Sequence, residues 1–232
     1  MTDTEQKFLF LGVGGMGMTP LACWMSKAGY SVTGHDTHLQ EGVRPWLKHY
    51  RVDIRDFILP EQIINFSTIV YSSALPQSHP LLVTARKAGL RCLKRGEMLN
   101  EIVRNKKLIA VVGSHGKTTT CGMIAHGSLY SSIELDYIIG GLFADSSIPP
   151  ARCCGSDWIV AEVDESDGTI DLFSPEVTVL LNIDWDHPDY YEDVSKLDAT
   201  FTHLLQRTRQ KIIGPRDLVL ESSGPAAVKY FD

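Results

Sequence analysis

The 232-residue sequence predicts an α/β fold in two parts, a Rossmann-like parallel-sheet domain followed by a P-loop-type α/β domain. Two glycine-rich turns, one near the N-terminus and one at mid-chain, each follow an apolar strand. Strands and helices alternate around them, which is the pattern of a doubly wound parallel sheet. The charge balance also changes sign near residue 106, and this change places the domain boundary there.

The first glycine-rich turn has the spacing G-x-G-x-x-G. It follows an apolar strand at 7–11 and opens a helix that continues to Gly29. Its glycines are Gly12, Gly14, Gly15 and Gly17. Glycines let the backbone approach a pyrophosphate, and the helix dipole favours its charge. A second strand at 30–34 leads to Asp36, the acidic residue that ordinarily receives a ribose hydroxyl. The turn therefore predicts a bound dinucleotide or another diphosphate-linked nucleotide, and does not separate NAD from the others.

A further strand at 68–71 ends in small polar residues, namely Ser72, Ser73 and Ala74. Open α/β sheets bind ligands at the carboxyl ends of their strands, although the same residues also suit a turn or a helix cap. Both interpretations stay open. A helix at 80–88 and a strand at 91–93 continue the alternation, and a helix at 96–105 is expected to link the two halves.

The second turn follows a buried strand at 108–112 and opens a helix at Lys117. Its residues are Gly113, Ser114, His115, Gly116, Lys117, Thr118 and Thr119. Backbone N–H groups at a helix N-terminus suit a phosphate, Lys117 adds a point charge, and the Thr118 hydroxyl suits magnesium. Val111 stands where the longer pattern has a glycine, so the motif is the short form G-x-x-G-K-T-T. It predicts a nucleoside triphosphate site, with an ordinary glycine turn as the alternative.

Carboxylates follow two later strands. A strand at 158–161 ends at Glu162, and a strand at 177–181 is followed within a few residues by Asp184 and His187. Parallel strands would bring these ends to the sheet edge that carries the phosphate turn, where a carboxylate, a hydroxyl and phosphate oxygens could hold one metal ion. His187 could be a metal ligand, a base or a structural residue.

The charge distribution supports two domains with different ligands. Residues 1–106 carry thirteen basic and nine acidic side chains, a net charge of +4, whereas residues 107–232 carry nine and nineteen, a net charge of −10. A basic first half suits an anionic partner. Twelve Asp or Glu and no Lys or Arg lie between Arg152 and Lys196. A phosphate site beside such a segment implies a cation such as Mg²⁺.

Composition excludes several other classes. The chain is 44% hydrophobic and 22% charged, which is ordinary for a globular protein. No apolar stretch is long enough to span a bilayer, and the polar N-terminus does not resemble a signal peptide, so we expect no membrane insertion. The five cysteines lack metal-ligand spacing, and reduced thiols in a cytoplasmic protein are expected. No basic stripe with interleaved aromatics indicates nucleic-acid binding.

Six motifs in this order resemble the Mur ligases of bacterial peptidoglycan synthesis. They are G-V-G-G-M-G-M, Y-S-S-A, R-G-E-M-L, G-S-H-G-K-T-T-T, A-E-V-D-E-S-D and N-I-D-W-D-H. The resemblance extends to about Arg207. It implies a UDP-sugar-binding domain at 1–106 and an ATP-binding central domain at 107–232.

The resemblance also implies roles for individual residues. Around the UDP-sugar it places Gly12, Gly14, Gly15, Gly17, Asp36, Ser72, Ser73 and Ala74. Around ATP it places Gly113 to Thr119. It implies that Thr118, Glu162 and His187 surround Mg²⁺, and that Lys117, Glu162 and His187 are catalytic.

The implied reaction is the ATP-dependent joining of L-alanine to the lactyl carboxylate of UDP-N-acetylmuramate through an acyl phosphate. The alternatives are a ligase that attaches recycled tripeptide to the same UDP-sugar, and an NAD-binding Rossmann protein or non-catalytic nucleotide-binding module. A-E-V-D-E-S-D and Y-S-S-A favour the alanine reaction.

The sequence departs from the family pattern at several points. Ser114 and Asp184 replace a common threonine and glutamate and keep the chemistry, whereas Pro188 could alter the local turn. After Ile213 the family's adenine-contacting stretch and its amino-acid-binding third domain have no counterpart, and residues 214–232 match no known pattern. We therefore expect an incomplete central domain, in a chain that alone binds the UDP-sugar, binds ATP weakly and does not ligate.

Overall fold

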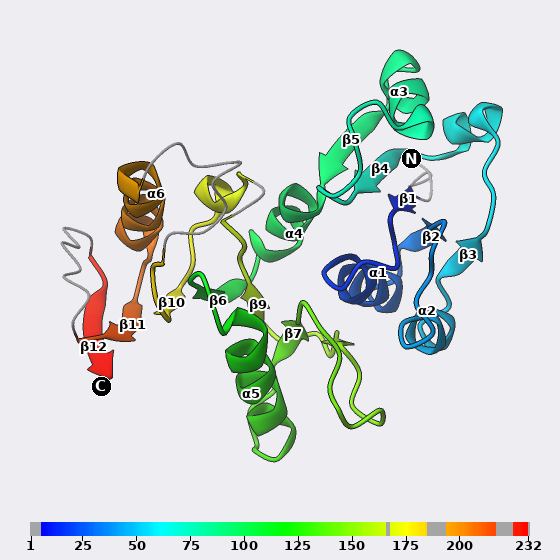
Figure 1. The fold of residues 1–232 in the computed structure, drawn as a ribbon. Coiled ribbons are helices and arrows are strands. Elements are labelled where there is room, and N and C mark those ends of the chain that lie inside the picture. The colour runs from blue at the N-terminus through cyan, green and yellow to red at the C-terminus, as the bar shows by residue number, and fades with distance from the viewer. Residues whose placement is uncertain (1–5, 166–167, 185–193, 217–224, 232) are drawn as a thin grey trace, which may run out of the picture. The chain divides into compact units, whose positions relative to one another are not determined.

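The computed structural model describes residues 6–165, 168–184, 194–216 and 225–231 (Figure 1). The chain forms two compact units. The first contains Met1–Met98 and Gly140–Cys153, and the second contains Leu99–Ile139 and Cys154–Asp232. The division along the chain falls inside helix α4 (Arg95–Val103), close to the helix expected at 96–105.

The first unit is built on a five-stranded sheet in the order β3-β2-β1-β4-β5, in which every pair of neighbours is parallel. Its strands are β1 (Lys7–Leu11), β2 (Ser31–His35), β3 (Asp53–Arg55), β4 (Thr68–Tyr71) and β5 (Arg91–Lys94). Its helices are α1 (Met18–Lys27), α2 (Arg44–His49), the 3₁₀ helix η1 (Pro60–Asn65) and α3 (Pro80–Lys87). The strand order β2-β1-β4, with β1 in the centre, is that of a Rossmann fold.

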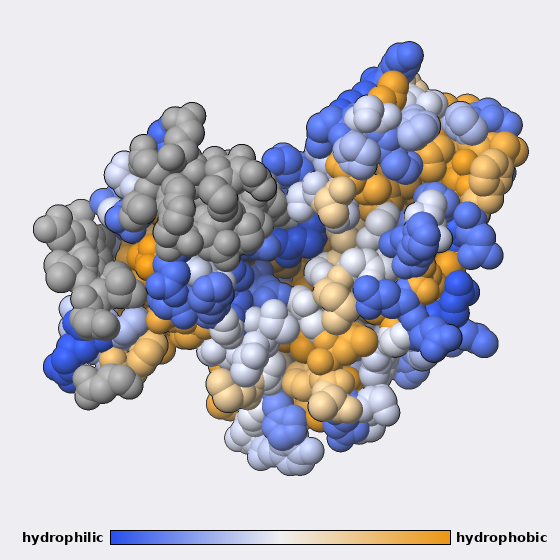
Figure 2. Space-filling model, viewed as in Figure 1, coloured by the Kyte–Doolittle hydropathy of each residue, from blue (hydrophilic) through white to orange (hydrophobic). Residues whose placement is uncertain are grey.

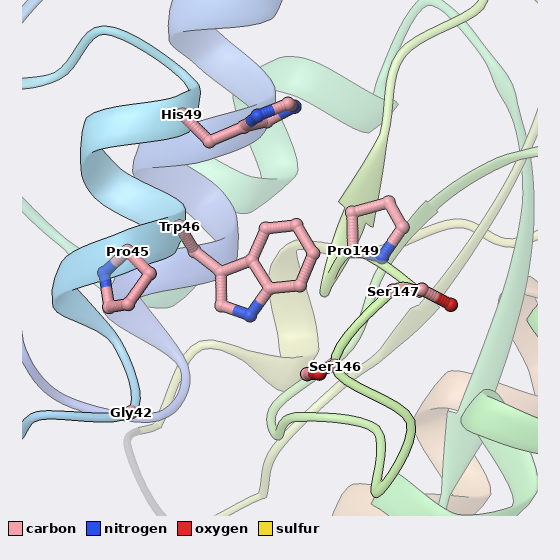
Figure 3. A pocket seen from close by; sticks show the side chains of 7 residues that line it. All are labelled: Gly42, Pro45, Trp46, His49, Ser146, Ser147 and Pro149. Atoms are coloured by element: carbon pink, nitrogen blue, oxygen red, sulfur yellow. The ribbon is translucent and has the colours of Figure 1, made fainter.

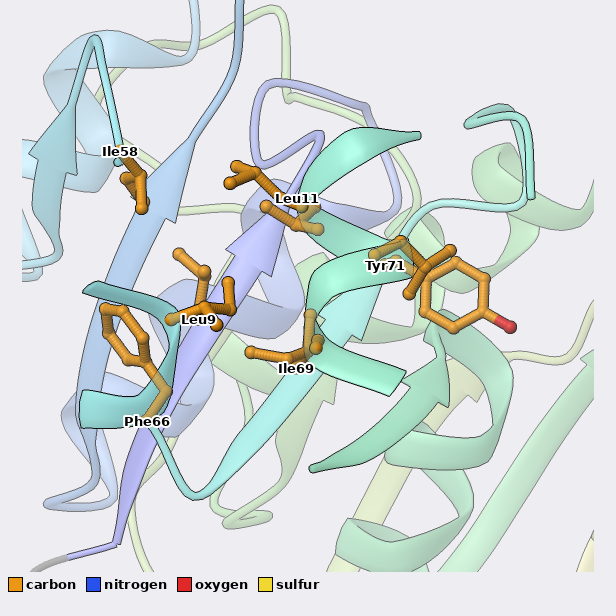
Figure 4. Packing of buried hydrophobic residues seen from close by; sticks show 10 residues of the cluster. Leu9, Leu11, Ile58, Phe66, Ile69 and Tyr71 are labelled. Atoms are coloured by element: carbon orange, nitrogen blue, oxygen red, sulfur yellow. The ribbon is translucent and has the colours of Figure 1, made fainter. Parts of the chain in front are cut away.

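One hydrophobic cluster of this unit packs η1 and α3 against the sheet (Figure 4). Leu9 and Leu11 of β1 lie beside Ile69 and Tyr71 of β4, and all four are buried. Phe8 and Phe10, which alternate with the two leucines along β1, are buried as well. A strand that is buried on both faces reads as a continuous apolar run, which explains the unbroken sequence F-L-F-L.

The strand register brings three distant parts of the chain to one edge of the sheet. Leu11 is paired with His35 of β2 and with Tyr71 of β4. The residues that follow these three, Gly12, Asp36 and Ser72, therefore lie at neighbouring carboxyl ends. This is the edge where doubly wound sheets bind ligands.

The second unit contains six strands of a larger sheet, which lie in the order β12-β11-β10-β6-β9-β7 with parallel neighbours. They are β6 (Lys107–Val112), β7 (Asp136–Ile138), β9 (Trp158–Glu162), β10 (Val177–Leu180), β11 (Lys211–Pro215) and β12 (Ala227–Phe231). Its helices are α5 (Lys117–Leu129), the 3₁₀ helix η2 (Ile170–Leu172) and α6 (Val194–Arg207). The two-residue strand β8 (Ala151–Arg152) belongs to the segment 140–153 of the first unit.

Both units thus have the parallel sheets and intervening helices that the sequence predicts, and the expected fold class is confirmed. Hydrophilic residues cover much of the face shown in Figure 2, with smaller apolar areas between them. None of the five cysteines, all of which lie among the described residues, forms a disulfide, and burial raises the pKa of the Cys23 thiol to about 12. Within the described ranges, none of the helices combines the length and the apolar character needed to cross a membrane.

Candidate functional site

Asp36 holds the glycine turn of the first unit in place. Its Oδ2 accepts a hydrogen bond from the Gly14 N–H at 2.8 Å, and its Oδ1 accepts one from the His38 N–H at 2.9 Å. A Cβ on Gly14 would lie 2.9 Å from Asp36 Oδ2, so this glycine is needed for the close approach. A carboxylate oxygen has two lone pairs, which leaves capacity for a ribose hydroxyl. The ribose role remains a prediction.

Ser72 forms a turn directly beside this glycine loop. Its carbonyl oxygen accepts from the Leu75 N–H at 3.0 Å, and its Oγ accepts from the Ala74 N–H at 3.3 Å. A Cβ on Gly12, whose φ is +79°, would lie 3.1 Å from Ser72 Cβ. The structure therefore forms a turn in this segment, and it places Ser72 beside Gly12. The role of these residues around a UDP-sugar remains a prediction.

Arg95 lies beside the glycine turn and is not among the residues expected there from the sequence. A Cβ on Gly17 would lie 2.9 Å from Arg95 Cδ and 3.3 Å from its Nε, so the guanidinium group lies close above the last glycine of the turn. Guanidinium groups bind phosphates well because their donors match phosphate geometry. The motif R-G-E-M-L contains Arg95, but its contact with a glycine 78 positions earlier depends on the fold.

The phosphate turn of the second unit adopts the backbone conformation that its glycines permit. Gly113 has φ +134° and Gly116 has φ +85°, both in the region that favours glycine. Gly116 is the N-cap of α5, so the first-turn N–H groups of that helix point toward the turn. The turn lies at the end of β6, where Val112 is paired with Leu180 of β10.

Residues just after β10 brace this turn. The Ser114 hydroxyl donates to the Asp184 carbonyl oxygen and accepts from the Asp184 N–H, both at 2.9 Å. The Asn182 side chain accepts from the His115 N–H at 2.8 Å and donates to the His115 carbonyl oxygen at 3.0 Å. These four bonds fix the turn from a segment about 70 residues away. The beginning of the motif N-I-D-W-D-H is thus a structural partner of the phosphate turn.

Two carboxylates, one at the end of β9 and one three residues after it, contact the first two residues of α5. The Thr118 hydroxyl donates to Glu162 Oε2 at 2.8 Å. The Lys117 ammonium group lies 3.1 and 3.0 Å from the two carboxylate oxygens of Glu165. Burial raises the pKa of Glu165, and the Lys117 ammonium partly offsets this by favouring the charged form. The structure therefore brings the expected Lys117, Thr118 and Glu162 together and adds Glu165.

The donor set around Thr118 suits a hard cation. A hydroxyl and a carboxylate oxygen lie within hydrogen-bond distance of each other, and Mg²⁺ prefers such oxygen ligands. Among the described residues, no group of three or more His, Cys, Asp or Glu side chains could hold a metal ion. The third expected ligand, His187, lies outside the described residues together with Pro188. A magnesium site at Thr118 and Glu162 therefore remains a prediction.

A separate cavity of about 570 Å³ lies within the first unit (Figure 3). The Trp46 ring of α2 points toward Pro149 of the segment 140–153. The remaining lining residues are Gly42, Pro45, His49, Ser146 and Ser147. The Tyr50 hydroxyl donates to the Ala151 carbonyl oxygen at 2.6 Å, and this bond ties the segment to the end of α2.

Replacing Tyr50 with phenylalanine is expected to destabilise the protein by about 1 kcal/mol, because a single neutral hydrogen bond is lost. A lower urea midpoint would report the change. The matched control is Tyr30→Phe, since the half-exposed ring of Tyr30 packs edge-on against Phe8 and keeps that contact without its hydroxyl. Equal midpoints for the two variants would show that the Tyr50 bond does not anchor the segment.

One protein family and several named proteins match this chain in sequence. The family described as "Mur ligase family, catalytic domain" matches residues 7–107. UDP-N-acetylmuramate–L-alanine ligase from Coxiella burnetii is 35% identical over 201 residues, and the match covers 86% of this chain and 43% of that protein. The ligase of the same name from a Synechococcus species is 39% identical over 206 residues, covering 84% and 42%. The chain thus spans less than half the length of these relatives.

Solved structures show the same fold. The UDP-N-acetylmuramate:L-alanyl-γ-D-glutamyl-meso-diaminopimelate ligase from Neisseria meningitides has a TM-score of 0.86 at 22% identity, covering 98% of this chain and 78% of that one. UDP-N-acetylmuramate–alanine ligase from Thermotoga maritima has a TM-score of 0.82 at 23% identity, covering 93% and 50%.

The two nucleotide-type turns on parallel sheets agree with these matches: the chain matches the Mur ligase family over residues 7–107, and its named relatives over most of its own length. Among the members of that family, it is similar to the curated UDP-N-acetylmuramate–L-alanine ligases.

Proposed function

We propose that this chain supplies the UDP-sugar-binding and ATP-binding parts of an ATP-dependent ligase that joins L-alanine to UDP-N-acetylmuramate in bacterial peptidoglycan synthesis. The names of the relatives that are 35–39% identical support the substrates. The observation that carries the proposal is the phosphate turn at the end of β6, with Lys117 and the Thr118–Glu162 pair at its helix.

The residues of this turn suit the charge problem of the reaction. A carboxylate must approach the terminal phosphate of ATP, and the two anions repel each other. The N-terminus of α5 and the Lys117 ammonium offer positive potential at that point. Thr118 and Glu162 would hold Mg²⁺, which neutralises phosphate charge when it is bound. An acyl phosphate then supplies the leaving group that a bare carboxylate lacks.

The first unit would hold the UDP-sugar. The glycine turn braced by Asp36 would take the diphosphate, and Arg95 beside Gly17 would add a cation to it. The segment at Ser72 would lie near the uridine. A cytoplasmic location follows from the substrates and remains a prediction.

The two alternatives from the sequence are not favoured. The curated relatives that cover 84–88% of this chain are named as L-alanine ligases, not tripeptide-recycling ligases. The structural likeness to a tripeptide ligase is at 22% identity and supports the fold alone. An NAD-binding module would not require a second phosphate turn whose lysine and threonine each contact a carboxylate.

Titration calorimetry with ADP tests the nucleotide site, with adenosine as the ligand that lacks phosphates. We expect saturable binding of ADP in the presence of Mg²⁺, weaker binding of ADP in EDTA, and no binding of adenosine. The proposal for the second unit would be wrong if ADP and adenosine behaved alike.

A further inference from the structure

The Lys117 ammonium group is held on several sides by the protein itself. It donates to the Gly113 carbonyl oxygen at 2.6 Å and to both carboxylate oxygens of Glu165, at 3.1 and 3.0 Å. The Ser114 carbonyl oxygen lies at 3.5 Å. An ammonium group has three N–H donors. Three close acceptors therefore match its full donor capacity before any phosphate is considered.

Burial makes this ion pair electrically important. The Glu165 side chain is 1% exposed and that of Lys117 is 13% exposed, so water screens the pair poorly. Together the two side chains carry no net charge, and Glu165 thus weakens the positive potential that Lys117 presents to a phosphate. Strand β9 ends at Glu162, and Glu165 lies three residues further along the chain. The end of this strand therefore sets the position of the Glu165 carboxylate.

We propose that Glu165 is a positioning residue. It holds the Lys117 ammonium group close to the Gly113 carbonyl oxygen of the phosphate turn, and it thereby weakens the binding of nucleotides that carry a β-phosphate. The inference rests on the proposed nucleotide site and deepens it. A β-phosphate oxygen can be bound by Lys117 only if it takes over a donor that Glu165 or Gly113 now uses. Glu165 also places a negative charge behind the lysine, which lowers the attraction for an incoming anion.

A purely structural ion pair is the competing explanation, and it makes a different prediction. Such a pair would change the stability of the unit when altered, but it would leave the relative affinities for nucleotides of different phosphate length unchanged. Competition for Lys117 instead affects ADP, which carries a β-phosphate, and spares AMP, which ends at the α-phosphate.

The test is Glu165→Gln, which keeps the size of the side chain and an oxygen acceptor for Lys117 but removes the charge. We expect the Kd for ADP, measured by calorimetry with Mg²⁺, to fall about tenfold. The ratio of AMP to ADP affinity should shift toward ADP by the same factor. Glu165→Ala should act in the same direction, and thermal melting of both variants records any loss of folding.

The outcomes separate the two proposals. An unchanged or higher Kd for ADP in both folded variants would overturn the role of Glu165, and so would an equal gain for AMP and ADP. Failure of the unaltered chain to bind ADP would instead overturn the proposed nucleotide site, on which the role depends.

Discussion

Replacing Lys117 with methionine is expected to raise the Kd for ADP by roughly two orders of magnitude, because a charged donor to the phosphates is lost. Titration calorimetry with Mg²⁺ measures the change. Lys229→Met is the control, since Lys229 is an exposed lysine of the same unit on β12. Equal affinity of Lys117→Met and the unaltered chain would show that the phosphate turn does not bind nucleotide through this residue.

The same substitution should also reduce stability in a pH-dependent way. It leaves the carboxyl group of Glu165 buried without its cation, and breaking a buried pair costs about 3–5 kcal/mol. The pKa of Glu165 is raised above its ordinary 4.5 by burial, so the native state binds a proton more readily than the unfolded state. Stability therefore falls as the pH rises from 4.5 through the raised value. Without Lys117 the pKa of Glu165 rises further. The loss of unfolding free energy relative to the unaltered chain should therefore be larger at pH 7 than at pH 5.

Urea unfolding at these two pH values measures this effect. A deficit that is the same at pH 5 and pH 7 would contradict the role assigned to the buried carboxyl group.

Gly113→Ala is expected to destabilise the second unit by about 3 kcal/mol and to abolish ADP binding. Gly113 has φ +134°, which L-residues rarely adopt, and a Cβ there would lie 2.8 Å from the Asn182 carbonyl oxygen and 3.0 Å from its backbone nitrogen. The turn must move to relieve these contacts with the backbone. That movement would displace the N–H groups that are expected to bind phosphate.

Gly127→Ala is the control, at the other end of helix α5 from the phosphate turn. Gly127 lies within α5, and a Cβ there meets nothing within 4 Å. Alanine has the higher helix propensity, so this variant should be about 1 kcal/mol more stable than the unaltered chain and should bind ADP normally. Denaturation midpoints and ADP titrations of both variants measure the difference. Similar stability of the two variants would contradict the geometry described for Gly113.

The elements that carry local signals could be predicted from the sequence. The strands β1 and β6 are short apolar runs that lead into glycine turns, and their bounds agree with the structure to within a residue. The expected neighbours Lys117, Thr118 and Glu162 meet because parallel strands place their carboxyl ends at one edge.

Other features depend on contacts between distant residues. Glu165 and Arg95 both belong to motifs that the sequence shows. Their contacts with Lys117 and with Gly17 depend on how distant segments of each unit pack together. The bracing of Ser114 by Asp184 joins residues 70 positions apart. Strand β12 has four hydrophobic residues in five, but it is short and follows a proline- and glycine-containing segment, so the sequence predicts no strand in residues 214–232; its pairing with β11 defines it.

Titration of the chain with UDP-N-acetylmuramate, with NAD as the parallel ligand, tests the central claim most directly. We expect saturable binding of the UDP-sugar and no binding of NAD, because the Asp36-braced turn and Arg95 are assigned to a UDP diphosphate. Saturable binding of NAD without binding of the UDP-sugar would contradict the ligase assignment of the first unit.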